Sequence, residues 1–297
     1  MEIHFEIENK CLLRCRHCSS QASSDGKTMD YSVGDMAAFL RRMKGRKEVY
    51  LTGGEPLLYS GVETLLECLN TEAGDTVLGM FTTGIRGNGL QKEAVSEEYA
   101  KQLAGHGLKV CYLSVYDSRK EEHDWMTGFK GSFAMTENAV RNFKKAGMDV
   151  RFNSVVTAKN ADKIPELIQM GKDWGISEIR LLKLISQGRA ENCWNEIGIT
   201  EERYRSIIRN ILEREHPVKI TASGAVDILP CRASGEKYVC PAGCQLWYVT
   251  YQGDVYPCAS VKNRTDYRIG NVKEDIWENC EKFCGRSNGK ILCGNIS

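Results

Sequence analysis

Three cysteines near the amino terminus have a spacing that suits metal chemistry, Cys11-x3-Cys15-x2-Cys18. Three thiolates on one short loop can bind three irons of a 4Fe-4S cubane, and the fourth iron is then free to bind another molecule. A structural zinc site normally takes four protein ligands in pairs. His17 could serve as a fourth ligand, but because it lies between two of the cysteines we expect it to pack beside the metal. The loop therefore favours a cluster over zinc.

A second motif, Thr52-Gly53-Gly54-Glu55-Pro56, ends a strand-like run. Paired glycines allow a backbone to approach a ligand closely, and a carboxylate beside them can accept hydrogen bonds from an ammonium group. A plain strand-to-helix turn is the alternative for such a segment. Its position relative to the cysteine loop favours a ligand-binding role.

The remaining cysteines divide into core and metal candidates. Cys68 and Cys111 lie in apolar runs, where a free thiol is commonly buried. Seven more follow residue 230: Cys231, Cys240, Cys244, Cys258, Cys280, Cys284 and Cys293. An odd total of 13 in a chain without a secretion signal argues against a disulfide framework. We therefore expect metal ligation in this tail as well, with zinc as the alternative to an iron–sulfur cluster.

Alternating strands and helices must position these residues. The apolar patterns predict strands at 3–7, 48–51, 77–82, 109–116, 149–156 and 179–185. They predict helices at 33–43, 62–69, 97–103, 133–146, 164–174 and 201–213, the first with Ser32 as its N-cap. This α/β alternation predicts a parallel sheet. Six units suit a partial (β/α)6 TIM-like barrel, although periodicity alone also allows a doubly wound sheet.

The pattern changes after about residue 216. A cysteine-rich tail follows, with a hairpin-like segment at 250–255 and one further helix expected at 274–283. We therefore predict two domains, 1–216 and 217–297. Further polar motifs also fall at strand ends, around Thr82, Ser114, Asn153 and Gln187. In barrel-like α/β folds this is the end where active sites are built.

Together, the cysteine loop after strand one and the Gly-Gly-Glu segment after strand two resemble the radical S-adenosylmethionine (SAM) superfamily. The resemblance implies that Cys11, Cys15 and Cys18 hold a 4Fe-4S cluster whose open iron binds SAM. It implies that Gly53, Gly54 and Glu55 hold the methionyl amino group. Ser114 and Asn153 are candidate contacts to the ribose or carboxylate of SAM, with a structural role as the alternative for each. Reductive cleavage would give a 5′-deoxyadenosyl radical that removes hydrogen from a substrate, the cofactor supplying the chemistry.

Two further segments are similar to those of peptide-modifying radical enzymes with a SPASM or twitch extension. One is His123-Asp124 followed by Gly131-Ser132-Phe133, in which His123-Asp124 could equally be a helix start, and the other is Gln187-Gly188-Arg189-Ala190. In the tail, Cys240-x3-Cys244, then Gly253-x4-Cys258, and later Gly270-Asn271 with Trp277, resemble the SPASM/twitch domain. No catalytic side chain is identified by these motifs.

The tail resemblance implies one auxiliary 4Fe-4S cluster, held by Cys240, Cys244, Cys258 and one later cysteine. The ending departs from the full SPASM pattern, and seven cysteines are fewer than the eight that two clusters require. Cys280 and Cys284 are candidate ligands, and which of Cys280, Cys284 and Cys293 completes the set stays open. Cys193 and Cys231 could be buried without function or could donate hydrogen to a substrate radical.

The function expected from this resemblance is that of a maturase that crosslinks or epimerises a ribosomally made peptide. No winged-helix segment of the kind that binds leader peptides precedes the first strand, which leaves the peptide substrate open. One alternative is a twitch-type dehydrogenase or epimerase that acts on a sugar or aminocyclitol. The other is a non-catalytic metal-binding interaction protein.

The expected partners are an external one-electron reductant, such as flavodoxin or ferredoxin, and the substrate. A net charge of +1 gives no sign of a nucleic-acid or membrane partner. Neither a signal peptide nor an apolar run long enough to span a bilayer is present, so we expect a cytoplasmic protein.

Overall fold

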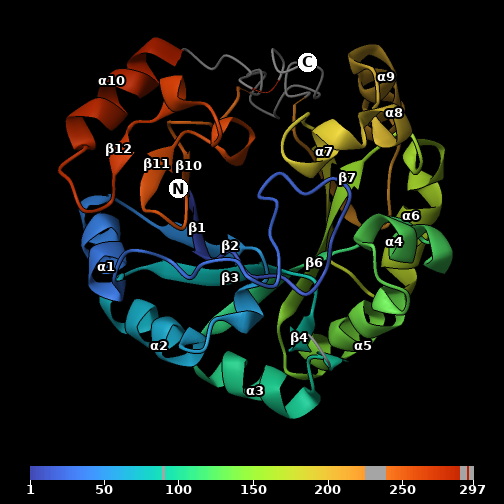
Figure 1. The fold of residues 1–297 in the computed structure, drawn as a ribbon, viewed down its shortest axis with the longest axis horizontal. Helices are drawn as coiled ribbons and strands as arrows, with labels where there is room; N and C mark the ends of the chain where they lie inside the picture. The colour runs from blue at the N-terminus through green and yellow to red at the C-terminus, as the bar shows by residue number, and fades with distance from the viewer. Residues whose placement is uncertain (89–90, 225–238, 288–292, 294–297) are drawn as a thin grey trace.

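The computed structural model describes residues 1–88, 91–224, 239–287 and 293, which form a long curved sheet with helices around its outer face (Figure 1). Six parallel strands carry the predicted barrel: β1 (Glu2–Glu8), β2 (Lys47–Gly53), β3 (Thr76–Thr82), β6 (Leu108–Ser114), β7 (Asp149–Val156) and β8 (Glu178–Lys183). They lie side by side in chain order. A doubly wound sheet reverses direction part-way along its strand order, so this order identifies the partial barrel.

The predicted helices are present between these strands. They are α1 (Val33–Arg42), α2 (Val62–Glu72), α3 (Glu97–Gly105), α5 (Ser132–Lys145), α6 (Ile164–Asp173) and α9 (Glu201–Leu212). Ser32 caps α1 as expected: its hydroxyl accepts a hydrogen bond from the Asp35 backbone N–H, and Asp35 accepts one from the Ser32 N–H. Gly147 lies just beyond α5 with a φ of 81°, which only glycine adopts readily.

Other elements were not predicted. They are the hairpin β4 (Ile85–Gly87) and β5 (Lys92–Ala94), helix α4 (Lys120–Thr127), the short helices α7 (Arg189–Asn192) and α8 (Trp194–Ile197), and strand β9 (Lys219–Ala222). The His123-Asp124 pair lies within α4 rather than at a helix start. Asp124 does act as a cap, but for the next helix, because its carboxylate accepts hydrogen bonds from the backbone N–H groups of Gly131 and Phe133.

The two faces of the barrel sheet differ in character. Alternate residues of each strand, such as Phe5, Leu51 and Leu113, are buried in the apolar core beneath the helices. The inner face is polar and aromatic near the amino ends of the strands. There Arg180 donates hydrogen bonds to Glu2 and to the Tyr112 hydroxyl, so charged groups fill this end of the barrel. The opposite, carboxyl end of the strands carries the sequence motifs.

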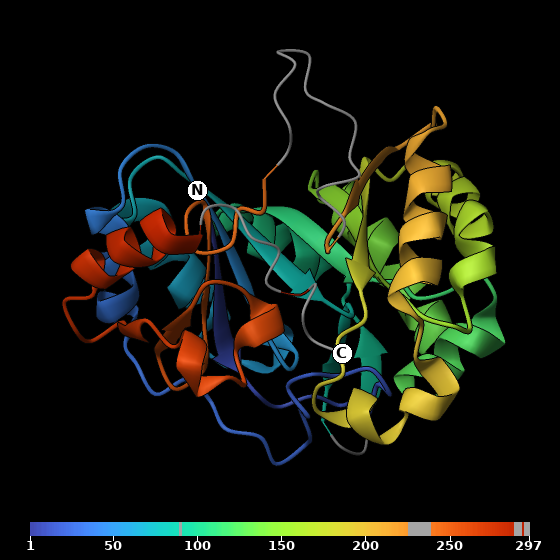
Figure 2. The same cartoon turned by 90° about the horizontal axis from the view of Figure 1, so that it is seen from above.

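The tail extends the same sheet. Strand β10 (Leu246–Val249) pairs in parallel with β1, and it forms the predicted hairpin with β11 (Asp254–Tyr256), in which Val249 faces Val255. Strand β12 (Gly270–Asn271) and helix α10 (Trp277–Ser287) follow. In Figure 2 the red and orange tail lies on one side of the molecule, and the yellow helices after β8 lie on the other.

The domain boundary and the membrane prediction are the last two expectations from the sequence. Strand β9 follows the predicted boundary at residue 216 and still pairs with β8, and the division into 1–216 and 217–297 stays a prediction. Within the described residues, no helix is both long and apolar enough to cross a membrane.

Candidate metal centre

The cysteine loop follows β1 and passes across the carboxyl ends of the strands, where Figure 1 shows it in blue in front of the sheet. Cys11 and Cys15 are buried and Cys18 is half-buried. Burial raises the pKa of Cys11 to about 12, and it raises the pKa of Cys15 with a contribution from the neighbouring Cys11 and Cys18 thiols. The three predicted ligands are therefore close together in a site where a thiolate needs a cation to stabilise it.

Hydrogen bonds to the backbone of this loop hold it from two sides. On one side, the Arg14 and Arg16 N–H groups donate to the Thr127 and Met126 carbonyls at the end of α4 (3.1 and 2.9 Å). On the other side, the Arg189 guanidinium donates to the Cys15 and Ala22 carbonyls, each at 2.8 Å. The Arg189 N–H also donates to the Cys18 carbonyl. The loop conformation is thus set by residues far away in the chain.

Among the described residues, no three His, Cys, Asp or Glu side chains converge as the ligands of a single metal ion do. The three thiolates of a cubane bind three different irons, so they need not converge on one point. Three clustered thiols on a fixed loop, two of them buried and one half-buried, are the donor set that such a cluster uses, and the residues present fit it.

The Gly-Gly-Glu segment lies directly against the start of the cysteine loop. The Gly54 N–H donates to the Glu8 carbonyl at 2.6 Å, and the Glu55 N–H donates to the Lys10 carbonyl at 2.7 Å. A Cβ on Gly54 would lie 2.2 Å from the Lys10 carbonyl oxygen, and Gly53 has a φ of 136°. The two glycines are therefore required for the contact between this segment and the cysteine loop, a reason that the sequence did not reveal.

The Glu55 carboxylate is buried and fully engaged in the turn. One oxygen accepts hydrogen bonds from the Thr82 hydroxyl and the Leu57 N–H, and the other accepts two from Thr83. A carboxylate has about four acceptor positions. Burial raises the pKa of Glu55, although these hydrogen bonds act in the opposite direction. The side chain therefore fixes the turn and has no acceptor position left over for an ammonium group.

The other two predicted cofactor contacts lie next to each other. Ser114 and Asn153 are register partners on β6 and β7. Each lies two residues beyond Tyr112 and Arg151, whose side chains hydrogen-bond on the inner face, so both point to the interior of the barrel. The Asn153 Oδ1 atom is buried and has no hydrogen-bond partner. Such an atom fits a site that a ligand with a donor group completes.

An aromatic group packs against the cysteine loop. The His17 ring lies 4.4 Å from the Tyr116 ring, and Tyr116 stacks on His123 at 5.6 Å. Burial lowers the pKa of His17 to about 3, so its imidazole is neutral. His17 thus packs beside the cysteines, as predicted. The sequence indicated the segment containing Tyr116 but did not identify this residue as a neighbour of the cysteines.

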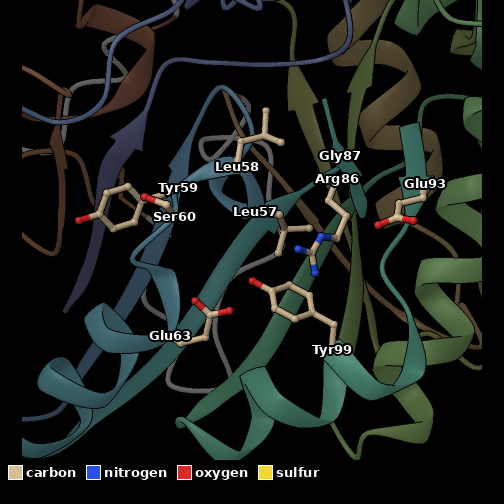
Figure 3. A pocket seen from close by; sticks show the side chains of 9 residues that line it. All are labelled: Leu57, Leu58, Tyr59, Ser60, Glu63, Arg86, Gly87, Glu93 and Tyr99. Atoms are coloured by element: carbon tan, nitrogen blue, oxygen red, sulfur yellow. The ribbon is translucent and has the colours of Figure 1, made fainter. Parts of the chain in front are cut away.

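A cavity of about 250 Å³ lies beside the Gly-Gly-Glu turn. Its walls come from the residues after β2, the β4–β5 hairpin and the first turns of α2 and α3, and Figure 3 shows Arg86 reaching in between Leu57 and Tyr99. None of the predicted ligands lines it. It is therefore separate from the surroundings of the cysteine loop.

The tail cysteines gather only in part as predicted. Cys258 and Cys240 are close enough to affect the pKa of Cys293, which burial raises to about 12. Cys244 and Cys284 are bonded to each other as a disulfide, with their Cα atoms 4.9 Å apart. This differs from the prediction of two thiolate ligands. The same proximity supplies two adjacent thiolates once the bond is reduced, as a reducing compartment favours.

The other tail candidates are placed differently. Cys280 lies on α10 and is buried in the apolar core, and its role as a ligand stays a prediction. Cys231 lies outside the described residues. Cys193 is half-buried at the junction of α7 and α8. The structure therefore joins Cys244 to Cys284, and it brings Cys240, Cys258 and Cys293 close enough to one another to affect the pKa values of Cys258 and Cys293.

Two family models match the chain. The family described as the radical SAM superfamily matches residues 5–171, and the SPASM iron–sulfur cluster-binding domain matches residues 240–293. The AdoMet-dependent heme synthase of Oleidesulfovibrio alaskensis is 22% identical, over 98% of this chain and 81% of its own. The PqqA peptide cyclase of Xanthomonas oryzae pv. oryzae is also 22% identical, over 95% and 75%.

A solved structure shares the fold. The structure of anSMEcpe with bound AdoMet and the Cp18Cys peptide has a TM-score of 0.71 at 18% identity, covering 100% of this chain and 84% of that one. At this identity the likeness extends to the fold alone.

Proposed function

The chain belongs to the radical SAM superfamily, and we propose that it cleaves SAM reductively and uses the resulting radical to modify a peptide. Membership implies a 4Fe-4S cluster and SAM, and the SPASM match implies auxiliary iron–sulfur binding. The observation that carries the proposal is the contact between the two motifs, in which the Glu55 N–H donates to the Lys10 carbonyl beside Cys11. This contact supports a single site that contains the proposed cluster ligands and the proposed cofactor-binding segment.

We assign Cys11, Cys15 and Cys18 as the ligands of the cluster. When bound, the cluster and SAM supply one-electron cleavage and a 5′-deoxyadenosyl radical that abstracts hydrogen. The protein residues fix this arrangement. Arg189 and the end of α4 hold the ligand loop, and the buried surroundings of Cys11 and Cys15 limit the access of water.

The proposed SAM contacts come partly from the backbone and partly from side chains. Since the Glu55 carboxylate is already saturated, we assign the contact with the methionyl amino group to the backbone of Gly53 and Gly54, with Glu55 holding their turn. Asn153 is supported by its unpartnered buried oxygen, which can accept a hydrogen bond from a ribose hydroxyl. Ser114, its neighbour across β6 and β7, is a second contact on the same face.

For the tail we propose one auxiliary 4Fe-4S cluster, held by Cys240, Cys244, Cys258 and Cys284. Two pairings support this set: Cys244 and Cys284 touch, and Cys240 lies close enough to Cys258 to affect its pKa, which burial raises. Cys293 also lies close to Cys258 and Cys240, and we leave Cys280 out of the proposed set. We place this cluster in a tail domain, 217–297, that packs on a radical domain, 1–216.

The peptide substrate is supported by the relatives. A peptide cyclase is similar over nearly the whole chain, and the related anSMEcpe structure contains a bound peptide. The similar heme synthase shows that relatives also act on other molecules. A flavodoxin or ferredoxin is the proposed source of the electron.

The experiment uses short peptides encoded beside the gene. Each is incubated anaerobically with the reconstituted enzyme, SAM and dithionite in deuterated water, and analysed by mass spectrometry. A crosslink removes two hydrogen atoms from the peptide, whereas epimerisation leaves its mass unchanged except for one incorporated deuterium. Peptides that return unmodified, while a sugar alcohol is oxidised under the same conditions, would contradict the peptide assignment. The Cys15→Ala variant serves as the control.

A further inference from the structure

We propose, on the basis of the function above, that four cations around the cysteine loop form a docking surface for an acidic one-electron carrier protein. They are Arg14, Arg16, Lys92 and Lys159, and we refer to them as the basic rim. Reductive cleavage requires one electron from outside the protein. The carrier gives up that electron and its own centre is oxidised by one, while the cluster is reduced by one and no bond in the carrier changes.

The segment 125–129 at the end of α4 organises the rim. The Arg16 guanidinium lies over the Trp125 ring, 4.3 Å from its centroid, and the Lys159 ammonium lies over the same ring at 5.2 Å. The Lys92 ammonium lies 4.3 Å from the Phe129 ring. Arg14 joins the group through its backbone, which donates to the Thr127 carbonyl. Residues from three separate parts of the chain thus meet around one short segment.

The cations of the rim are not neutralised by the protein. Among the described residues, none of the four forms an ion pair within 4 Å, and the Arg16 Nε atom is buried without a hydrogen-bond partner. Beside Lys159, whose carbonyl accepts a hydrogen bond from Arg119, the Asp117 and Glu122 carboxylates pair with Arg119. A hydrogen bond from Ser23 lowers the pKa of Asp25, and the charge of the nearby Arg14 makes a smaller contribution in the same direction. The rim therefore keeps a positive excess on a chain whose net charge is only +1.

The rim is both fixed and accessible. Arg14 and Lys159 are exposed, and Arg16 and Lys92 are half-buried. Aromatic rings hold three of the cations in place, so a partner that binds them loses less side-chain entropy on docking. Charge complementarity of this kind mainly raises the association rate and orients the partner.

The position of the rim favours a carrier over other acidic partners. Arg14 and Arg16 are part of the ligand loop itself, so a protein docked there is next to the cluster. Electron tunnelling decays steeply with distance, which makes this the surface where a donor is most effective. An acidic peptide substrate is the competing occupant, and the test below separates the two.

The test compares two reductants in a Lys92→Glu/Lys159→Glu variant. Both positions lie outside the ligand loop. With reduced flavodoxin, the concentration that gives half-maximal 5′-deoxyadenosine formation should rise at least about tenfold and depend less on salt. With dithionite, which needs no docking surface, the rate should equal that of the wild type. Lys44→Glu, an exposed lysine between α1 and β2 at the amino end of the strands, is the matched control and should change neither rate.

Several results would overturn the docking surface. One is an unchanged flavodoxin dependence in the double variant, and another is an equal loss with dithionite. A raised KM for substrate with dithionite as reductant would show that the rim binds substrate instead. Biolayer interferometry measures the binding of flavodoxin to the reconstituted protein directly, and this measurement does not depend on turnover. A wild type that binds flavodoxin but does not cleave SAM would refute the proposed function alone, whereas undiminished binding by the variant would refute the rim.

Discussion

The Lys262 ammonium lies 2.6 Å from the Glu6 carboxylate, and both side chains are only 4% exposed. Glu6 belongs to β1, whereas Lys262 belongs to the tail, four residues after Cys258. Lys262 also donates to the hydroxyls of Tyr248 and of Ser20, which lies two residues after Cys18. One buried cation thus joins the first strand, the tail and the end of the cysteine loop.

We expect this pair to matter for stability. Lys262→Met leaves the Glu6 carboxylate buried without its cation and should lower the free energy of unfolding by about 3–5 kcal/mol. Replacing both partners by apolar residues, as in Glu6→Leu/Lys262→Met, should recover much of that loss. Anaerobic guanidinium denaturation gives the comparison. Lys273→Met, which breaks an exposed contact with Asp30, should cost no more than about 1 kcal/mol. Equal losses for the two single variants would contradict the role of the pair.

The same pair predicts a dependence on pH. Burial alone would raise the pKa of Glu6, but the Lys262 ammonium and the hydrogen bonds from Lys262, Tyr248 and the Tyr251 N–H hold it below its usual value of 4.5. A carboxyl with a lowered pKa stabilises the fold above the pKa of the unfolded chain, and the stabilisation is lost as the pH falls through the folded value. The difference in unfolding free energy between the cluster-free wild type and Glu6→Gln should therefore shrink below about pH 4.5. Parallel curves for the two proteins would refute this assignment.

Gly54→Ala should remove the cluster with little change elsewhere. The added Cβ would lie 2.2 Å from the Lys10 carbonyl and would push the cysteine loop away from the Gly-Gly-Glu segment. We expect loss of about half of the iron and of the cluster absorbance after reconstitution, with the auxiliary cluster of the tail retained. Gly105→Ala, at a position in α3 with nothing within 4 Å of its Cβ, is the control and should reconstitute normally. Normal cluster content in Gly54→Ala would show that the loop tolerates the displacement.

Two neighbouring cysteines of α10 should differ in their effect on the auxiliary cluster. Cys284 meets Cys244, whereas Cys280 is packed in the core. Cys284→Ala should therefore lose about half of the iron that two 4Fe-4S clusters bind, while Cys280→Ala should keep it. Iron and sulfide analysis after anaerobic reconstitution provides the measurement. The reverse result would move the ligand assignment to Cys280.

The parts of the site that depend on local sequence were predictable. The spacing of Cys11, Cys15 and Cys18 fixes three thiols on one loop, and strand periodicity places Gly53 and Gly54 at a strand end. The alternation of six strand–helix units predicted a partial barrel with a doubly wound sheet as the alternative, and the strand order in the structure decided between them. The hairpin of β10 and β11 was also visible, because it is a local pattern of alternating residues around a glycine.

Contacts between distant residues could not be predicted. Arg189 reaches a carbonyl 174 positions away, and Lys262 reaches a carboxylate 256 positions away. The role of Asp124 was also missed. The sequence does not show whether an aspartate caps the helix that contains it or, as Asp124 does, the start of the following helix. The sequence did not decide between Cys280 and Cys284 as ligands, whereas in the fold Cys284 meets Cys244.

The most direct test of the account is the formation of 5′-deoxyadenosine by the anaerobically reconstituted protein with SAM and dithionite. We predict equal amounts of 5′-deoxyadenosine and methionine from the wild type and from Cys68→Ala, whose cysteine lies on α2 away from the ligand loop. Cys11→Ala, Cys15→Ala and Cys18→Ala should each form none. Undiminished product from any of these three variants, or no product from the wild type with a full complement of iron, would contradict the assignment of this loop as the site of SAM cleavage.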